Sequence, residues 1–372
     1  MKRIAVLLSL SAAAWLCLLA AQQGPTREGG ETVARPKTKE APKEAELPKV
    51  PSQFGKKPDL PEGAPTFRSD VTTVNVDVAV LDSRGRFIPN IPKGYFRILE
   101  ENVPQQISTF EVGEAPMTVC LVVEFSNLFQ SYWSATWYET LQAAYTFVQG
   151  LKPDDYLAVV AYDMRPEILS DFSTDRRQAQ EAMRRLNIAA YSEANLYDAL
   201  TDTADRMSGI EGRKAIVLLS SGIDTFSRKT FGETRKSLQA AGVPIYAVGL
   251  MQAIRIYMES YGYLGPIASL DFLQADNQMR TFANETGGQA FFPRFEAEFP
   301  GIFRQISDGM RNQYSFTYQP SNQARDGKFR RIKVELVDPA TNKPLRVVDE
   351  NKKTIKYTII AKSGYVAPRA VE

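Results

Sequence analysis

The sequence predicts an α/β fold, in which a doubly wound, mostly parallel sheet is flanked by β-strands on its N- and C-terminal sides. Residues 117–123 form an unbroken apolar run, and a strand that is apolar at every position must be covered on both faces, as at the centre of a parallel sheet. From residue 132 to residue 311, further apolar strands alternate with helical patterns, which indicates repeated βαβ units. Outside that stretch the apolar residues recur every second position, which is typical of strands with one buried face.

The N-terminal residues predict export. Residues 1–21 have a basic head, an apolar middle and small residues before a polar stretch, which is the pattern of a secretory signal peptide. We therefore expect a periplasmic, cell-envelope or extracellular protein without a membrane span after cleavage. Retention of this segment as a membrane anchor is the alternative. Residues 22–66 are rich in proline, lysine, glutamate and glycine, which predicts a disordered linker.

Two β-regions surround the predicted α/β domain of residues 116–312. The N-terminal region covers residues 67–115, where valines at every second position from 74 to 80 indicate a strand. The C-terminal region covers residues 313–368 and shows the same period. Neither region has enough strands to bury its own apolar face. We therefore expect the two to form one β-sandwich with the α/β domain inserted between its halves, and two small independent modules are the alternative.

Within the α/β domain, the strands and helices follow from apolar spacing. The expected strands cover residues 117–123, 156–162, 168–169, 214–220, 244–249 and 289–292. The expected helices cover residues 132–151, 175–186, 195–207, 231–241, 269–286 and 297–311, with Thr174 as an N-cap of the second. Residues 251–276 interrupt the alternation with several tyrosines and two glycines. A connection of this length predicts a functional loop.

Composition excludes several classes of function. The chain of 372 residues contains no histidine, so a Ser-His-Asp or Cys-His catalytic site is impossible. No Ser-x-x-Lys, Gly-x-Ser-x-Gly, Walker or Gly-x-Gly-x-x-Gly motif is present.

The acidic pair Asp154-Asp155 lies in a predicted turn, where we expect it to be solvated. With 45 basic and 43 acidic residues, the charge favours no nucleic-acid partner. We predict a protein that is not an enzyme and needs no cofactor.

Cysteine use agrees with export. Cys17 lies in the predicted signal segment and Cys120 lies on the apolar strand of residues 117–123. The mature chain therefore has no internal disulfide, and we expect Cys120 to be a small core residue.

Three segments identify a family resemblance. Residues 121–127, 192–200 and 216–224 resemble the corresponding stretches of a von Willebrand factor type A domain. The flanking residues 94–102, 326–334 and 363–365 look like the bacterial, acidobacterial-type branch of VWFA-related domain proteins, so the resemblance covers about residues 67–368. It implies a Rossmann-like sheet and a metal-ion-dependent adhesion site at the strand ends. Such a site is built from Asp-x-Ser-x-Ser, a threonine and a later aspartate, which are hard oxygen ligands for Mg²⁺ or Ca²⁺.

This sequence departs from that ligand pattern at most positions. Glu124 replaces the first aspartate and Ser126 is retained, but Leu128 replaces the second serine. The threonine position falls on Ala194, and Ser221 replaces the later aspartate. Because Mg²⁺ demands near-ideal octahedral oxygen coordination, the two remaining ligands predict a degenerate site that holds no metal.

A rebuilt metal site is the alternative. Glu124, Ser126 and Asp224 are then the candidate ligands of a weakly bound Mg²⁺ or Ca²⁺, with Glu193 and Asp198 nearby in the alignment. Asp198 also has a structural interpretation, since a carboxylate in the first turns of a helix interacts favourably with the helix dipole.

The prediction for function is an exported, non-enzymatic binding or scaffold protein. We expect it to recognise a protein partner through the carboxyl ends of the sheet strands and the 251–276 segment, without a required metal. Tyrosines bury a large area at low entropic cost and are enriched in interfaces, although packing of these rings over the sheet end is the alternative. The candidate partner-binding residues are Asn127, Glu193, Ser221, Tyr257, Tyr261 and Tyr263. A divalent-dependent adhesion protein and a purely structural envelope component are the alternative functions.

Overall fold

The structure is a computed structural model. It describes residues 73–369 apart from 114–115, 128–132, 187–190, 211, 264 and 349–353. The predicted signal segment, the predicted linker and Leu128 lie outside the described residues.

The α/β body contains one six-stranded sheet, with strand order β10-β9-β8-β5-β6-β7. All adjacent pairs are parallel except β6 and β7, which are antiparallel. The strands are β5 (Met117–Glu124), β6 (Tyr156–Tyr162), β7 (Pro166–Ser173), β8 (Arg213–Ser220), β9 (Ile245–Gly249) and β10 (Ala290–Phe291). The predicted mostly parallel sheet is therefore confirmed, with β5 at its interior.

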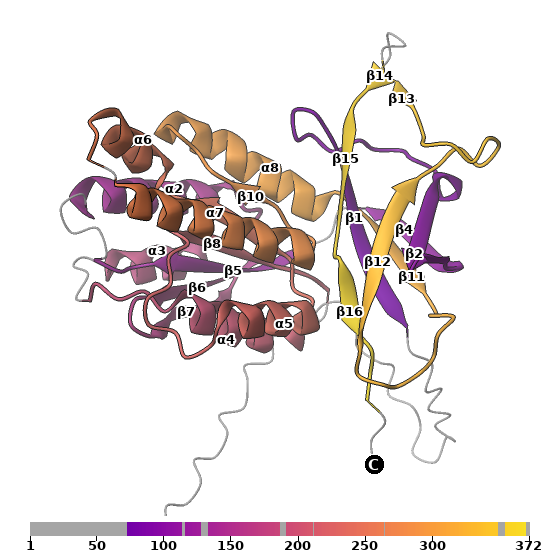
Figure 1. Ribbon diagram of the computed structural model, residues 1–372, viewed down its shortest axis with the longest axis horizontal. Coiled ribbons are helices and arrows are strands. Elements are labelled where there is room, and N and C mark those ends of the chain that lie inside the picture. Colours follow the sequence, from indigo (N-terminus) through magenta and orange to yellow (C-terminus); the bar gives the residue numbers. More distant parts are fainter. Residues whose placement is uncertain are drawn as a thin grey trace, which may run out of the picture. The chain divides into compact units, whose positions relative to one another are not determined.

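Helices cover both faces of this sheet (Figure 1). On one face lie α2 (Trp133–Gly150), α3 (Arg176–Arg184) and α8 (Phe299–Arg311). On the other lie α4 (Leu196–Ser208), α5 (Phe231–Ala241) and α7 (Pro266–Thr286). Successive residues of β5 point to alternate faces, so Leu121 joins the first core and Val122 the second. No helix among the described residues combines the length and apolar character that crossing a bilayer requires.

The 251–276 segment is helical rather than a loop. It contains α6 (Gln252–Ser260) and the first half of α7. The sequence prediction was wrong because α6 is only nine residues long and no side chain caps its N-terminus. A short helix without these start signals is difficult to distinguish from a loop.

Two details of the α/β body also differ from the prediction. Asp155 is fully buried instead of solvated. Its carboxylate is ion-paired with Arg311 and accepts hydrogen bonds from the Met117 and Lys152 N–H groups at 3.1 and 2.8 Å. Such a pairing is what a buried carboxylate requires. The N-cap of α3 is Asp175 rather than the predicted Thr174. The Asp175 side chain accepts a hydrogen bond from the Arg177 N–H in the first turn of the helix.

The β-regions form one sandwich. Its sheets have the strand orders β15-β1-β11-β4 and β16-β12-β2-β3. The first contains β1 (Val74–Asp82), β4 (Ile107–Gly113), β11 (Gln313–Tyr318) and β15 (Tyr357–Ala361), and the second contains β2 (Phe96–Glu100), β3 (Val103–Pro104), β12 (Phe329–Leu336) and β16 (Gly364–Val366). Each sheet thus mixes strands from both sides of the α/β body, and the two share one apolar core. The exact positions of the predicted domain boundaries stay a prediction.

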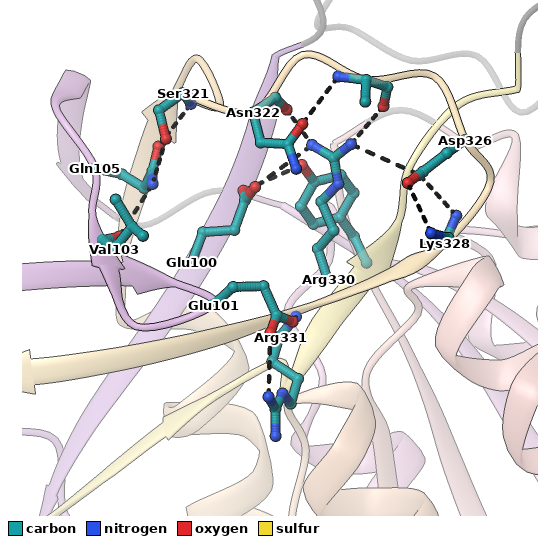
Figure 2. A network of polar contacts seen from close by, with 12 residues as sticks. Glu100, Glu101, Val103, Gln105, Ser321, Asn322, Asp326, Lys328, Arg330 and Arg331 are labelled. Atoms are coloured by element: carbon teal, nitrogen blue, oxygen red, sulfur yellow. Dashed lines mark hydrogen bonds and ion pairs between the residues drawn. The ribbon is translucent and has the colours of Figure 1, made fainter.

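A buried polar network joins four strands of the sandwich (Figure 2). Glu100 and Arg330 are 3% and 4% exposed, and Arg330 Nη1 lies 3.5 Å from Glu100 Oε1. Tyr318 and Tyr365 donate their hydroxyl hydrogens to Glu100 Oε2 at 2.7 and 3.1 Å. Arg330 also donates to two backbone carbonyls in the segment after β11. The network therefore satisfies both buried charges.

Candidate functional site

The candidate site lies at the sheet edge where parallel strands end. Glu124 is the last residue of β5 and Ser220 the last residue of β8, and the two strands are neighbours in parallel register. The N–H group of Leu250, just after β9, donates to the Ser220 carbonyl at 3.0 Å. We call the polar residues at these strand ends the rim, and they are Glu124, Ser126, Asn127, Ser220 and Ser221.

Both carboxylate oxygens of Glu124 accept hydrogen bonds from the rim itself. Oε1 accepts from the Ser126 hydroxyl at 2.7 Å. Oε2 accepts from the Ser221 backbone N–H at 2.7 Å and from the Ser220 hydroxyl at 3.0 Å. The Ser221 hydroxyl lies 2.8 Å from Oε2 and 3.0 Å from Oε1. Because a carboxylate offers about four lone-pair sites, these donors occupy most of its accepting capacity.

Tyr162, the last residue of β6, adds a hydroxyl group to this network. Its hydroxyl lies 3.2 Å from Glu124 Oε2 and 2.8 Å from Ser220 Oγ. Burial, followed by the negative charge of Glu124, raises the pKa of Tyr162 well above its usual value. The phenol therefore remains protonated and serves as a donor.

Sequence reasoning missed Tyr162 and Ser220, although each carries a usable signal. Tyr162 ends β6 and Ser220 ends β8, the two strands that flank β5. The last residues of adjacent parallel strands lie next to one another. A polar group in that position could have been paired with Glu124 once the strand order was known.

The residue at the threonine position supplies no side-chain oxygen. Ala194 is fully buried, and its backbone is fixed by Thr225. The Ala194 N–H donates to Thr225 Oγ1 at 2.9 Å, and the Ala194 carbonyl accepts from the Thr225 N–H at 2.8 Å. The hydroxyl of Thr225 thus holds two loops together.

Two of the predicted acidic residues organise the start of α4. Asp224 Oδ1 accepts from the Tyr197 N–H at 3.2 Å and from the Ser227 hydroxyl at 2.5 Å. Asp198 lies in the first turn of α4 and accepts from the N–H groups of the two residues after Ser227 at 3.0 and 3.1 Å. Both carboxylates therefore join α4 to the loop after β8. Asp198 lies in the first turn of α4 as expected, and its hydrogen bonds go to the loop.

The remaining predicted residues are not part of the Glu124 network. Glu193 is half-buried, and its Oε1 lies 3.4 Å from the Ser192 hydroxyl. The Asn127 N–H donates to the Tyr191 carbonyl at 2.6 Å. The side-chain Oδ1 of Asn127 is buried and has no hydrogen-bond partner among the described residues. An unsatisfied acceptor of this kind costs about 1–3 kcal/mol, which a polar group from outside would recover.

The sequence of the α/β body matches a known family. Residues 121–223 match the profile of the von Willebrand factor type A domain. The α/β body is a type A domain. This confirms the resemblance seen in the sequence, whereas assignment to the acidobacterial-type branch stays a prediction. A comparison with curated proteins finds no match.

Solved structures with a similar fold come from animals and bacteria. Proximal thread matrix protein 1 from the mussel byssus is 15% identical, with a TM-score of 0.41, and the alignment covers 57% of this chain and 51% of that one. The vWF domain of the type V pili tip protein Mfa5 from Porphyromonas gingivalis is 13% identical over 54% of this chain and 97% of that one, with a TM-score of 0.39. A von Willebrand factor type A structure from Catenulispora acidiphila is 11% identical over 80% of this chain and 75% of that one, with a TM-score of 0.39. The chain spans about half the length of the mussel protein in its two crystal forms, 48% and 51%.

A second surface of the type A domain is formed by the end of α6 and the turn that follows it. Tyr257, Tyr261 and Tyr263 are 49%, 62% and 65% exposed. The ring centroids of Tyr257 and Tyr261 are 4.8 Å apart, and those of Tyr261 and Tyr263 are 5.8 Å apart in a stacked arrangement. We call these three residues the tyrosine surface. The rings are largely exposed to solvent. The alternative considered from the sequence, in which they pack over the sheet end, does not describe this arrangement.

Proposed function

We propose that this protein is an exported, non-enzymatic recognition or scaffold protein whose type A domain binds a protein partner without a divalent cation. The observation that carries the proposal is the hydrogen bonding of Glu124. Its oxygens accept from Ser126, Ser220 and Ser221, so the carboxylate that would hold a cation instead holds the rim together.

The residues present do not fit the divalent cation that a type A domain implies. Ser126 and Glu124 are hydrogen-bonded to each other, so a cation would have to break that bond to use both as ligands. Ala194 contributes no oxygen, and Asp224 is bonded to the start of α4. Among the described residues, no group of three or more aspartate, glutamate or cysteine side chains is placed to hold a metal. We infer a degenerate adhesion site.

Two features of the type A domain support recognition of a protein. The buried amide oxygen of Asn127 has no hydrogen-bond partner within the part of the chain that the structure describes. The tyrosine surface offers aromatic side chains of the type that dominates interfaces. Export is supported by the signal-like sequence of residues 1–21. The chain has no histidine to act as a general base near these groups.

Calorimetric titration of the full chain with Mg²⁺, Ca²⁺ and Mn²⁺ tests the metal-free part of the proposal. We expect no saturable heat below millimolar concentrations. One-site binding in the micromolar range that Asp224→Asn abolishes would overturn it and support the divalent-dependent alternative built on Glu124, Ser126 and Asp224. Glu193→Gln is the matched control, because it removes a nearby charge outside the Glu124 network.

Affinity capture from the native envelope tests recognition. Wild-type chain is used as bait in buffer with EDTA and in buffer with Mg²⁺, and we expect the same partner in both. Asn127→Ala and Tyr261→Ala variants should each recover less of it, while Phe295→Ala, which changes a 70% exposed ring elsewhere, should recover as much as wild type. Equal recovery by all variants would favour a purely structural envelope component.

A further inference from the structure

The tyrosine surface has the chemistry of a platform for proline-rich peptides. Tyr261 and Tyr263 are stacked and more than 60% exposed, and Leu270, at the start of α7, is 63% exposed. Rows of aromatic rings are what proline-rich segments bind, because the rings pack against prolines of an already extended peptide at little entropic cost.

The segment that carries the tyrosine surface is acidic. Residues 251–276 contain one basic residue, Arg255, and three carboxylates, which gives a net charge of −2. Arg255 is paired with Asp276 at 3.1 Å and with Glu259 at 3.6 Å. The third carboxylate, Asp271, is exposed beside Leu270. A peptide that carries lysines together with prolines therefore complements this surface in charge, and its ammonium groups can also lie over the tyrosine rings.

The chain itself contains a sequence of this kind. Residues 48–58 read Pro-Lys-Val-Pro-Ser-Gln-Phe-Gly-Lys-Lys-Pro, with three prolines, three lysines and no acidic residue. Pro48 and Pro51 have the Pro-x-x-Pro spacing of peptides that bind aromatic grooves. The net charge of +3 is opposite in sign to that of residues 251–276.

The chain is also long enough for this segment to reach a distant part of its own molecule. The described part begins at residue 73 and β1 at Val74, so 15 residues separate Pro58 from β1. When extended, they can span about 50 Å. This is about one and a half times the length of the 21-residue helix α7, which at 1.5 Å per residue is about 32 Å.

We propose that residues 48–58 bind the tyrosine surface of the same chain and compete there with a proline- and lysine-rich partner. The inference rests on the proposed recognition role of this surface and adds the chemical class of the partner. Docking is intramolecular, so the segment acts at a high effective concentration. An external peptide must therefore be present at a higher concentration, or bind more tightly, to displace it.

A labelled synthetic peptide of residues 48–58 provides the test, with binding followed by fluorescence polarisation. It is titrated into the full wild-type chain and into a full chain carrying Pro48→Ala, Pro51→Ala and Pro58→Ala. We expect about tenfold tighter binding to the alanine chain, because its own segment no longer competes. Adding Tyr261→Ala and Tyr263→Ala to that chain should weaken binding at least tenfold. Adding Phe226→Ala, a 53% exposed ring elsewhere, should leave it unchanged.

Three results would overturn the inference. Equal affinity for the wild-type and alanine chains would show that the segment does not occupy the surface in its own molecule. Absence of saturable binding, or binding insensitive to the tyrosine substitutions, would show that the surface does not take this peptide. These failures are separable from failure of the proposed function, because envelope capture that still depends on Tyr261 would leave partner recognition standing.

Discussion

The Oε2 atom of Glu124 lies 2.7 Å from the backbone nitrogen of Ser221, so the last residue of β5 is bonded directly to the first residue after β8. The carboxylate and this N–H thus join the end of β5 to the loop after β8. A hydrogen bond to a charged acceptor is among the stronger kinds. The rim is therefore held together by its own residues.

Glu124→Ala should destabilise the type A domain. The substitution leaves the Ser221 N–H without its acceptor, and a part-buried donor that loses its partner costs about 1–3 kcal/mol. Urea unfolding followed by circular dichroism measures the free energy of unfolding. Glu193→Ala, which removes a nearby carboxylate with one weak contact, should change it by less than about 0.5 kcal/mol. Equal effects of the two substitutions would contradict the structural role of Glu124.

Divalent cations should not stabilise the folded protein. A cation that binds only the folded state raises the melting temperature in proportion to the logarithm of its concentration. Because the Glu124 oxygens are already hydrogen-bonded, we expect melting curves in 10 mM Mg²⁺ and in EDTA to agree within about 1 °C at matched ionic strength. A midpoint that rises steadily with Mg²⁺, but not with the same ionic strength of NaCl, would contradict this.

Arg330 and Arg331 are adjacent in sequence but should differ greatly in their contribution to stability (Figure 2). Arg330→Met leaves the buried Glu100 carboxylate without its cation, which should cost about 3–5 kcal/mol. Arg331→Met breaks an exposed pair with Glu101, which should change the free energy of unfolding far less, because water and salt screen an exposed pair. Denaturant unfolding of both variants measures the difference. Recovery of stability when Glu100→Leu is added to Arg330→Met would show that the uncompensated charge is the cause.

Cys120 should be unreactive in the folded protein. The side chain is 2% exposed, and burial raises the pKa of its thiol to about 12. At pH 8 only about one thiol in ten thousand is then ionised, whereas a free cysteine is about one quarter ionised. In a Cys17→Ser chain, Ellman's reagent should detect no thiol at pH 8 until denaturant is added, and then one. Rapid labelling without denaturant would contradict the buried position of Cys120.

Much of the fold could be predicted because local sequence and tertiary packing agree. The α5 helix was predicted at residues 231–241 and occupies Phe231–Ala241, where a Thr230–Glu233 capping box begins it and Gly242, with a φ of 61°, ends it. The α6 helix was missed because it is nine residues long and no side chain caps its N-terminus. Local rules identify elements that are capped or long, and α6 is neither.

The candidate site was only partly predictable. Glu124, Ser126 and Ser221 were found by their place in the type A pattern, and the structure joins all three. Tyr162 could not be found in this way, because its contact with Glu124 depends on which strand lies beside β5. The buried pair of Asp155 and Arg311 is separated by more than 150 residues, and for the same reason the turn chemistry around Asp155 gave the wrong expectation.

The strand order of the sandwich fixes an order of events during synthesis. Val74 pairs with Tyr318 and Val78 pairs with Ala361, so β1 has neither neighbour until the C-terminal strands have emerged from the ribosome. The two apolar cores of the type A domain are built from residues between 117 and 310, so they can form while β1 is still unpaired. A chain truncated after residue 312 would therefore keep these cores and lose the sheet that contains β1, even though every residue of β1 is still present.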